Sequence, residues 1–142
     1  MPTDHVRTIV RGIVARGDQR GRTLGFPTAN LAIAGLAVPD GVFSGWLQRA
    51  DTELHAAAIS VGGRPTFYGR RGVRLVEAHV LDFDADLYGE VVTVALEVRL
   101  RAQRRFGEIN ELVEQLKIDV EQTAAWWQRA PSELRSPAVA RH

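Results

Sequence analysis

Side chains of different character alternate with a two-residue period at residues 74–83 and 90–100. This period is typical of β-strands that bury one face, because successive side chains point to opposite sides of the chain. A polar second face also favours antiparallel strands, since parallel strands are usually buried on both faces. The pattern predicts strands at residues 74–83 and 90–100. Apolar and β-branched runs next to turn signals predict three more strands, at residues 7–15, 42–49 and 53–61, and a helix is the alternative for the alanine run of the last.

The predicted strand at residues 74–83 carries an acidic residue, Glu77, in an otherwise apolar run. The face expected to join the core holds Val76, Ala78 and Val80. The face that holds Glu77 also carries Leu75, His79, Leu81 and Phe83. A carboxylate among apolar neighbours suits a general base. A cross-strand ion pair with an arginine such as Arg99 is the structural alternative.

The apolar spacing changes to three, four and seven residues after Phe106. This spacing predicts one amphipathic helix of about five turns, with Gly107 as its N-cap. Its apolar stripe consists of Ile109, Leu112, Val113, Leu116, Val120, Ala124 and Trp127. Pro131 ends the helix, and residues 131–142 are expected to form a frayed or disordered tail. Residues 1–130 therefore form one all-β barrel or sandwich with a C-terminal helix.

Composition supports one globular domain and excludes several classes of chemistry. The 142 residues are 45% hydrophobic and 25% charged, with a net charge of +1. Cysteine is absent, which excludes disulfides and thiolate metal sites and is consistent with the cytoplasm. No stretch approaches about 18 consecutive apolar residues, so no membrane span is expected. The near-neutral charge argues against a nucleic-acid partner, and the arginines around Arg99–Arg105 are expected to be solvated.

A glycine-rich segment at residues 17–25 is a candidate phosphate-binding loop. It holds Gly17, Arg20, Gly21, Arg22 and Gly25. Glycines let backbone N–H groups approach an anion, and arginines donate to phosphate oxygens. The spacing matches neither the Rossmann fingerprint nor the Walker A motif. An ordinary solvated loop is therefore the alternative.

The next residues, Phe26-Pro27-Thr28-Ala29-Asn30, offer candidate metal ligands. The residue before a proline is extended, and continued extension puts Thr28 and Asn30 on one face, about 6.5 to 7 Å apart. Their hydroxyl and amide oxygens could hold a Mg²⁺ that takes its other ligands from water and nucleotide phosphates. The alternative is a turn in which these side chains bond the local backbone.

Five blocks of the chain, taken in order, resemble the riboflavin kinase family over about residues 8–125. The blocks are GDQRGRTLGFPTANL, PDGVFSGW, AAISVGGRPTF, VEAHVLDFDADLYGE and LRAQRRFGEINELVEQL. The resemblance implies a six-stranded antiparallel Greek-key barrel with a C-terminal helix. It also implies transfer of the γ-phosphate of ATP to the ribityl 5′-hydroxyl of riboflavin, which gives FMN and ADP.

The resemblance also assigns roles to individual residues. It implies that Glu77 is the catalytic base and that Thr28 and Asn30 hold Mg²⁺. The residues implied in nucleotide binding are Gly17, Arg20, Gly21, Arg22, Gly25, Pro27, Thr28 and His79. Those implied on the flavin side are Arg101, Arg104, Phe106 and Leu112.

The chain departs from the family pattern in two ways. Gly63-Arg64 stands where family members commonly carry Thr-Asn, and we hypothesise that Arg64 points toward the ligand cleft. No signature of the adenylylating domain of bifunctional members is found, so FAD synthesis is not expected. A monomer without membrane or nucleic-acid partners is expected. A non-catalytic flavin- or nucleotide-binding regulatory barrel is the alternative function, and a purely structural barrel is the third.

Overall fold

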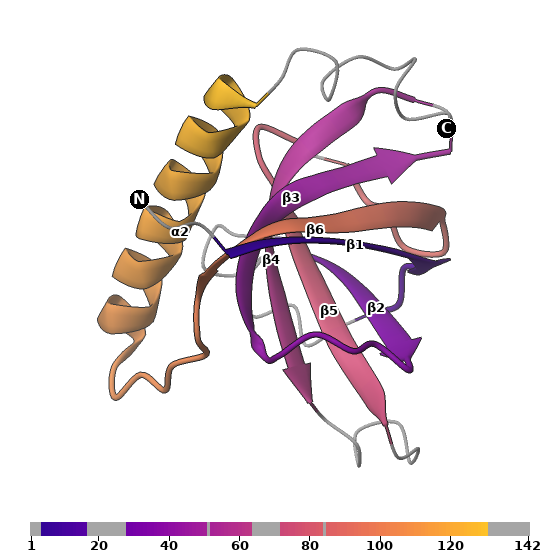
Figure 1. Cartoon of the computed structure of the whole chain (residues 1–142). Coiled ribbons are helices and arrows are strands. Elements are labelled where there is room, and N and C mark those ends of the chain that lie inside the picture. The colour runs from indigo at the N-terminus through magenta and orange to yellow at the C-terminus, as the bar shows by residue number, and fades with distance from the viewer. Residues whose placement is uncertain (1–3, 17–27, 51, 64–71, 84, 131–142) are drawn as a thin grey trace.

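In the residues that it describes, the computed structural model contains six strands and one long helix (Figure 1). It describes residues 4–16, 28–50, 52–63, 72–83 and 85–130. The elements are β1 (Asp4–Ile13), β2 (Ala29–Ala34), β3 (Gly41–Arg49), β4 (Leu54–Gly63), β5 (Val73–Val80), β6 (Val91–Arg101) and α2 (Ile109–Arg129). All five strands predicted from the sequence are present, with shifted ends. The predicted tail at residues 131–142 lies outside the described residues.

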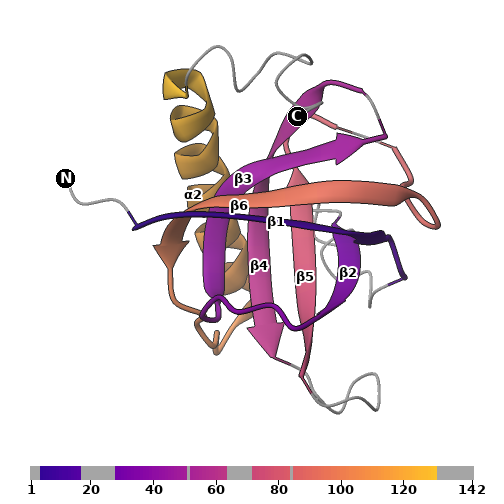
Figure 2. The ribbon, with the colours of Figure 1, turned by 45° about the vertical axis from the view of Figure 1, so that its right-hand side comes forward.

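The six strands form one antiparallel sheet in the order β1-β6-β3-β4-β5-β2. The sheet curls strongly, so that its two edge strands approach each other (Figure 2). An isolated bridge joins Ala15, just after β1, to Asn30 in β2, with 2.8 Å between the Ala15 nitrogen and the Asn30 oxygen. The expected barrel fold is confirmed.

The inside of the curled sheet holds the main hydrophobic core. In β5 the alternation places Val76, Ala78 and Val80 in this core, as predicted. Its fully buried members include Leu31, Phe43, Leu47, Ile59, Val61, Val92, Val94 and Leu96. Glu77 and His79 therefore lie on the outer face of β5, because neighbouring side chains alternate.

The helix α2 packs against the outer face of β3 and β4 (Figure 1). A second, smaller apolar cluster lies between them and contains Trp46, Leu54, Ala95 and Ala130, with Trp126 and Trp127 packed against it. The indole Nε1 of Trp46 donates to Glu97 Oε2 at 2.8 Å. Arg7 pairs with the same oxygen at 3.2 Å, which compensates the burial of this carboxylate.

The predicted apolar stripe of the helix is wrong in part. Ile109 is 51% exposed and Ala124 is exposed, whereas the deeply buried helix residues are Asp119 and Thr123. Thr123 shares a 2.9 Å hydrogen bond with the hydroxyl of Ser44 in β3. The face toward the sheet is therefore partly polar, since β3 itself presents a polar side chain there. The N-cap is Glu108 rather than Gly107.

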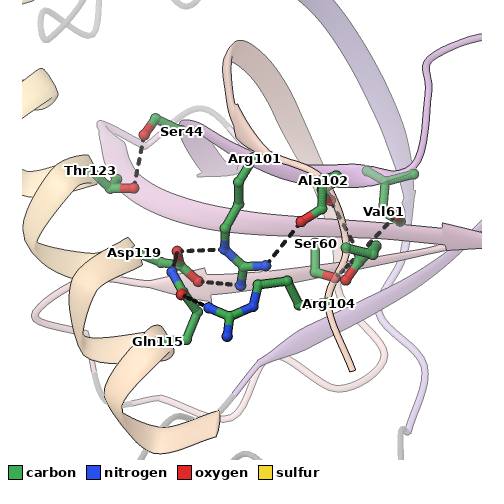
Figure 3. Close-up of polar contacts among 11 residues, drawn as sticks. Ser44, Ser60, Val61, Arg101, Ala102, Arg104, Gln115, Asp119 and Thr123 are labelled. Carbon is green, nitrogen blue, oxygen red and sulfur yellow. Dashed lines mark hydrogen bonds and ion pairs between the residues drawn. The ribbon is translucent and has the colours of Figure 1, made fainter. Parts of the chain in front are cut away.

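A buried ion pair joins the end of β6 to the middle of α2. The Asp119 carboxylate accepts hydrogen bonds from Arg101 Nε at 2.9 Å and Nη2 at 2.7 Å, and from Gln115 Nε2 at 3.0 Å (Figure 3). The side chain of Asp119 is 2% exposed and that of Arg101 is 18% exposed. The expectation that Arg101 is solvated is therefore wrong, because this buried carboxylate requires a cationic partner.

Replacing Asp119 by alanine is expected to lower the free energy of unfolding by about 3 kcal/mol, because Arg101 loses its buried partner. Equilibrium unfolding in urea measures this change. Glu114→Ala is the matched control, since it removes an exposed helix pair with Lys117 and should cost less than about 0.5 kcal/mol. An Asp119→Ala protein as stable as the Glu114→Ala protein would contradict the prediction.

Candidate functional site

Three polar side chains form a row across the outer face of neighbouring strands. Glu77 in β5 is the register partner of Asn30 in β2 on one side and of Ser60 in β4 on the other. Directly opposed residues of antiparallel strands point to the same face, with Cα atoms about 4.5 to 5.5 Å apart. The predicted catalytic carboxylate and one predicted metal ligand are therefore neighbours.

The alternative partner for Glu77, Arg99, does not occupy the required position. Arg99 belongs to β6, which is separated from β5 by β3 and β4 in the sheet. A cross-strand pair between the two is therefore excluded by the strand order. Arg99 Nη2 instead donates to the backbone oxygen of Asp40 at 2.8 Å.

A pocket opens where the ends of β1 and β2 meet the turn after β5. Thr28 and Asn30 both line it, so the two predicted metal ligands share one cavity. The other lining residues are Val14, Ala15, Arg16, Ala29, Ala78, Val80, Phe83, Ala85, Asp86, Leu87 and Tyr88. Asn30 is only 8% exposed, so it is not the exposed amide that an isolated extended segment would present. Asn30 belongs both to the pocket and to the row that contains Glu77.

The rim of this pocket was not found by sequence reasoning. Arg16 lies 4.1 Å from the centre of the Tyr88 ring, a cation–π contact between two segments far apart in the chain. The Gly89 nitrogen donates to Val14 oxygen at 2.9 Å and fixes the two segments side by side. Tyr88 and Gly89 form a turn, and no local pattern in the sequence indicates which strand this turn contacts.

An ion pair supports the wall of the pocket from outside. Arg49 donates to both Glu90 oxygens, at 2.9 and 2.8 Å, and its guanidinium lies 5.8 Å from the centre of the Phe83 ring. The hydrogen bond from Arg49 lowers the pKa of Glu90, and the same bond raises the pKa of Arg49. Both groups therefore stay charged near neutral pH, and their ion pair holds the Arg49 guanidinium beside the Phe83 ring.

The connection between β6 and α2 reaches the other end of the polar row. Gln103 Nε2 donates to Ser60 Oγ at 2.8 Å, to Val61 oxygen at 3.0 Å and to Gly41 oxygen at 3.2 Å. The Arg104 guanidinium lies 5.0 Å from the centre of the Phe106 ring. This connection carries two of the four residues predicted to face the flavin, Arg104 and Phe106, and a third, Arg101, is the last residue of β6.

The remaining predicted residues are distributed as follows. Leu112 is half-buried on α2, and His79 is the register partner of Ala58 on the outer face of β5. His79 is not among the residues that line the pocket. The residues that lie outside the described part of the chain are Gly17, Arg20, Gly21, Arg22, Gly25, Pro27 and Arg64.

The described residues contain neither a cluster of acidic, histidine or cysteine metal ligands nor a membrane-spanning helix. Within these ranges, no group of three or more histidine, cysteine, aspartate or glutamate side chains is arranged to hold a metal ion. No helix in the described ranges has both the length and the apolar character to cross a membrane.

Comparison with known proteins places the chain in a family. The model of the family described as riboflavin kinase matches residues 5–127. A bifunctional riboflavin kinase/FMN adenylyltransferase of Bacillus subtilis is 33% identical over 121 residues, which are 83% of this chain and 38% of the relative. The RNA-binding riboflavin kinase RibR of the same species is 34% identical over 113 residues, 80% of this chain and 48% of the relative.

A solved structure shows the same architecture. The crystal structure of riboflavin kinase from Trypanosoma brucei matches with a TM-score of 0.63 and 27% identity, covering 84% of this chain and 79% of that one. The chain spans less than half the length of the two Bacillus relatives. The match of the family model to most of its residues is nevertheless decisive: the chain belongs to the riboflavin kinase family.

Proposed function

We propose that this chain is a riboflavin kinase that uses ATP. The ribityl 5′-hydroxyl oxygen of riboflavin forms a bond to the γ-phosphorus, and the bond from that phosphorus to the bridging oxygen of ADP breaks. FMN and ADP are the products, and the hydroxyl proton passes to Glu77. The observation that carries this proposal is the double position of Asn30, which lines the pocket and is the register partner of Glu77.

The pocket is proposed to bind the nucleotide. Part of its lining is apolar, with Val80, Phe83 and Leu87, and these side chains suit the faces of a nucleobase. Tyr88 and Arg16 at the rim add an aromatic ring and a positive charge. The glycine-rich segment 17–25 precedes Thr28 in the chain, so its amides and arginines are proposed to bind the phosphates.

Mg²⁺ is proposed to accompany the nucleotide, and the residues present fit this ion. Asn30 Nδ2 is 3.5 Å from the backbone oxygen of Thr28, which is the longest distance allowed for a hydrogen bond. This contact turns the amide nitrogen of Asn30 toward the backbone. The Asn30 Oδ1 atom and the Thr28 hydroxyl are then the hard oxygens that Mg²⁺ prefers. When bound, the ion would neutralise charge on the transferring phosphate.

Riboflavin is proposed to bind on the outer face, next to the connection from β6 to α2. Arg104 and Phe106 form a planar cation and an aromatic ring that suit a flavin ring, and Leu112 adds apolar surface. Glu77 in β5 lies between Ser60 of β4, which this connection contacts, and Asn30 of β2, which lines the pocket. The two substrates would therefore meet at Glu77. Arg101 is already committed to Asp119, so its contribution to the flavin side is to hold the connection in place.

The protein is further proposed to be a cytoplasmic monomer, because the substrates are cytoplasmic metabolites and the site is built within one chain. No nucleic-acid partner is proposed for this chain, although one relative is called RNA-binding. A regulatory barrel that binds flavin without turnover remains the competing function, and the first experiment separates the two.

Incubating the pure protein with riboflavin, ATP and Mg²⁺ is expected to yield FMN and ADP in equal amounts. Liquid chromatography with mass spectrometry measures both products. Omitting Mg²⁺ should abolish turnover, because the phosphate charge is then not neutralised. Tight riboflavin binding without any FMN would support the regulatory barrel instead.

Replacing Asn30 by alanine is expected to lower activity at least tenfold and to raise the Mg²⁺ concentration needed for half-maximal rate. Titrating Mg²⁺ at saturating ATP measures this shift. Because Asn30 is buried, urea unfolding of the same variant must be measured to show that the protein is folded under assay conditions. An unchanged Mg²⁺ titration would remove Asn30 from the metal site.

Replacing Glu77 by glutamine is expected to lower kcat by roughly 10² to 10⁴-fold, because the shape remains and the base is lost. Riboflavin affinity and thermal stability should stay near the values of the parent. Glu114→Gln, which removes an exposed carboxylate on α2, is the control and should change neither quantity. Reduced stability with unchanged kcat would show that Glu77 has a structural role only.

A further inference from the structure

The aromatic ring of Phe83, which lines the pocket, is contacted by side chains from two other strands. The ring of His55 in β4 lies 5.0 Å from it, at an interplanar angle of 57°. The guanidinium of Arg49, the last residue of β3, lies 5.8 Å from the centre of the same ring. Neither His55 nor Arg49 lines the pocket. Both therefore act on a surface that a bound molecule would meet without contacting that molecule themselves.

Glu90 fixes the Arg49 guanidinium in this place. Arg49 donates from Nε to Glu90 Oε1 at 2.9 Å and from Nη2 to Glu90 Oε2 at 2.8 Å. Such a two-point contact sets the orientation of the planar guanidinium as well as its distance. Asp86, another carboxylate of this region, instead accepts a hydrogen bond from the backbone nitrogen of Tyr88 at 3.0 Å.

The backbone of Glu90 is bonded to the pocket wall. Its nitrogen donates to Leu87 oxygen at 3.0 Å, and its oxygen accepts from Val14 nitrogen at 2.9 Å. Leu87 and Val14 both line the pocket. The contacts thus form a closed path that runs from the wall through Glu90 and Arg49 to Phe83 and back to the pocket.

We propose that Arg49 and Glu90 are positioning residues that determine how tightly the pocket holds a planar nucleobase. The ion pair holds the guanidinium beside Phe83, and the guanidinium and His55 together hold the Phe83 ring in the orientation that lines the pocket. A ring fixed before binding loses little side-chain freedom when a nucleobase packs against it. The inference rests on the proposed nucleotide site, and it adds two residues that act through Phe83.

The test measures the binding of ADP with Mg²⁺ by isothermal titration calorimetry. Arg49→Met keeps the length of the side chain and removes its charge and donors, so it is expected to weaken ADP binding about fivefold. Glu90→Gln should weaken it too, since one hydrogen bond from Arg49 loses its acceptor. The Arg49 and Glu90 side chains are 36% and 35% exposed, so neither substitution opens a cavity in the core.

Steady-state kinetics of the same variants gives a second readout. The KM for ATP is expected to rise by the same factor as the dissociation constant of ADP. The kcat and the KM for riboflavin should not change, because a lost contact to the base affects the ground state and the transition state equally. A fall in kcat without a rise in the KM for ATP would contradict the positioning role.

A double-variant cycle tests whether Arg49 acts through the Phe83 ring. Phe83→Leu keeps an apolar lining, so ADP binding remains measurable. Adding Arg49→Met to Phe83→Leu is expected to weaken binding no further, because the ring that Arg49 holds is absent. Losses that add in the double variant would show that Arg49 acts on the pocket by another route.

Two control variants separate this effect from loss of any ion pair. Lys117→Met removes an exposed pair with Glu114 on α2 and should leave ADP binding unchanged. Arg74→Met removes a partly buried arginine that pairs with Asp40 and lies at the start of β5, the end of that strand away from the pocket. It should lower stability and leave ADP binding unchanged. If it weakens binding as much as Arg49→Met does, the positioning role is wrong.

Calorimetry also separates failure of this inference from failure of the kinase proposal, because it needs no turnover. Weaker ADP binding in Arg49→Met, with no further loss in the Phe83→Leu background, supports the positioning role even if the parent forms no FMN. Unchanged ADP binding in Arg49→Met overturns that role even if the parent is an active kinase. A parent that binds no ADP overturns both the role and the proposed nucleotide pocket.

Discussion

The ion pair between Arg101 and Asp119 determines where the helix lies and what the segment before it can contact. Arg101 is the last residue of β6, and Asp119 is in the middle of α2, so two hydrogen bonds fix both ends of the intervening connection. Gln103, only two residues beyond Arg101, then reaches β3 and β4. Without this pair, the helix would have mainly the small Trp46 cluster to hold it against the sheet.

The register of the sheet brings the candidate site together. Asn30, Glu77 and Ser60 are far apart in the chain but opposite one another in β2, β5 and β4. Curling of the sheet also brings Asn30 to Ala15, which forms one wall of the pocket. The close approach of β3 and β6 is part of this geometry, since a Cβ on Gly45 would lie 1.7 Å from the Ala95 oxygen. Glycine is required there because two backbones occupy the space of a side chain.

In β5, alternation was sufficient to predict which side of the strand is buried, but it did not predict the polar contacts. In β5 it placed Val76 in the core and Glu77 outside, as observed. On α2 the apolar period was misleading, because Asp119 and Thr123 face the sheet. A signal was present in the sequence: Gln115, Asp119 and Thr123 are spaced by four residues and so share one face of a helix. Its meaning depended on Arg101 and Ser44, which no local pattern connects to the helix.

The sequence by itself determined the strand segments, the C-terminal helix and the residue types that point to phosphate chemistry, because these depend on local periodicity and side-chain chemistry. The five ordered blocks likewise carry the resemblance to the riboflavin kinase family, which the match of the family model confirms. Only the tertiary structure decided that Asn30 joins the pocket to Glu77, that Arg99 is too distant to pair with Glu77, and that Gln103 contacts Ser60. These relations depend on strand order and curvature, which arise from packing of the whole barrel and leave no periodic trace in any one segment.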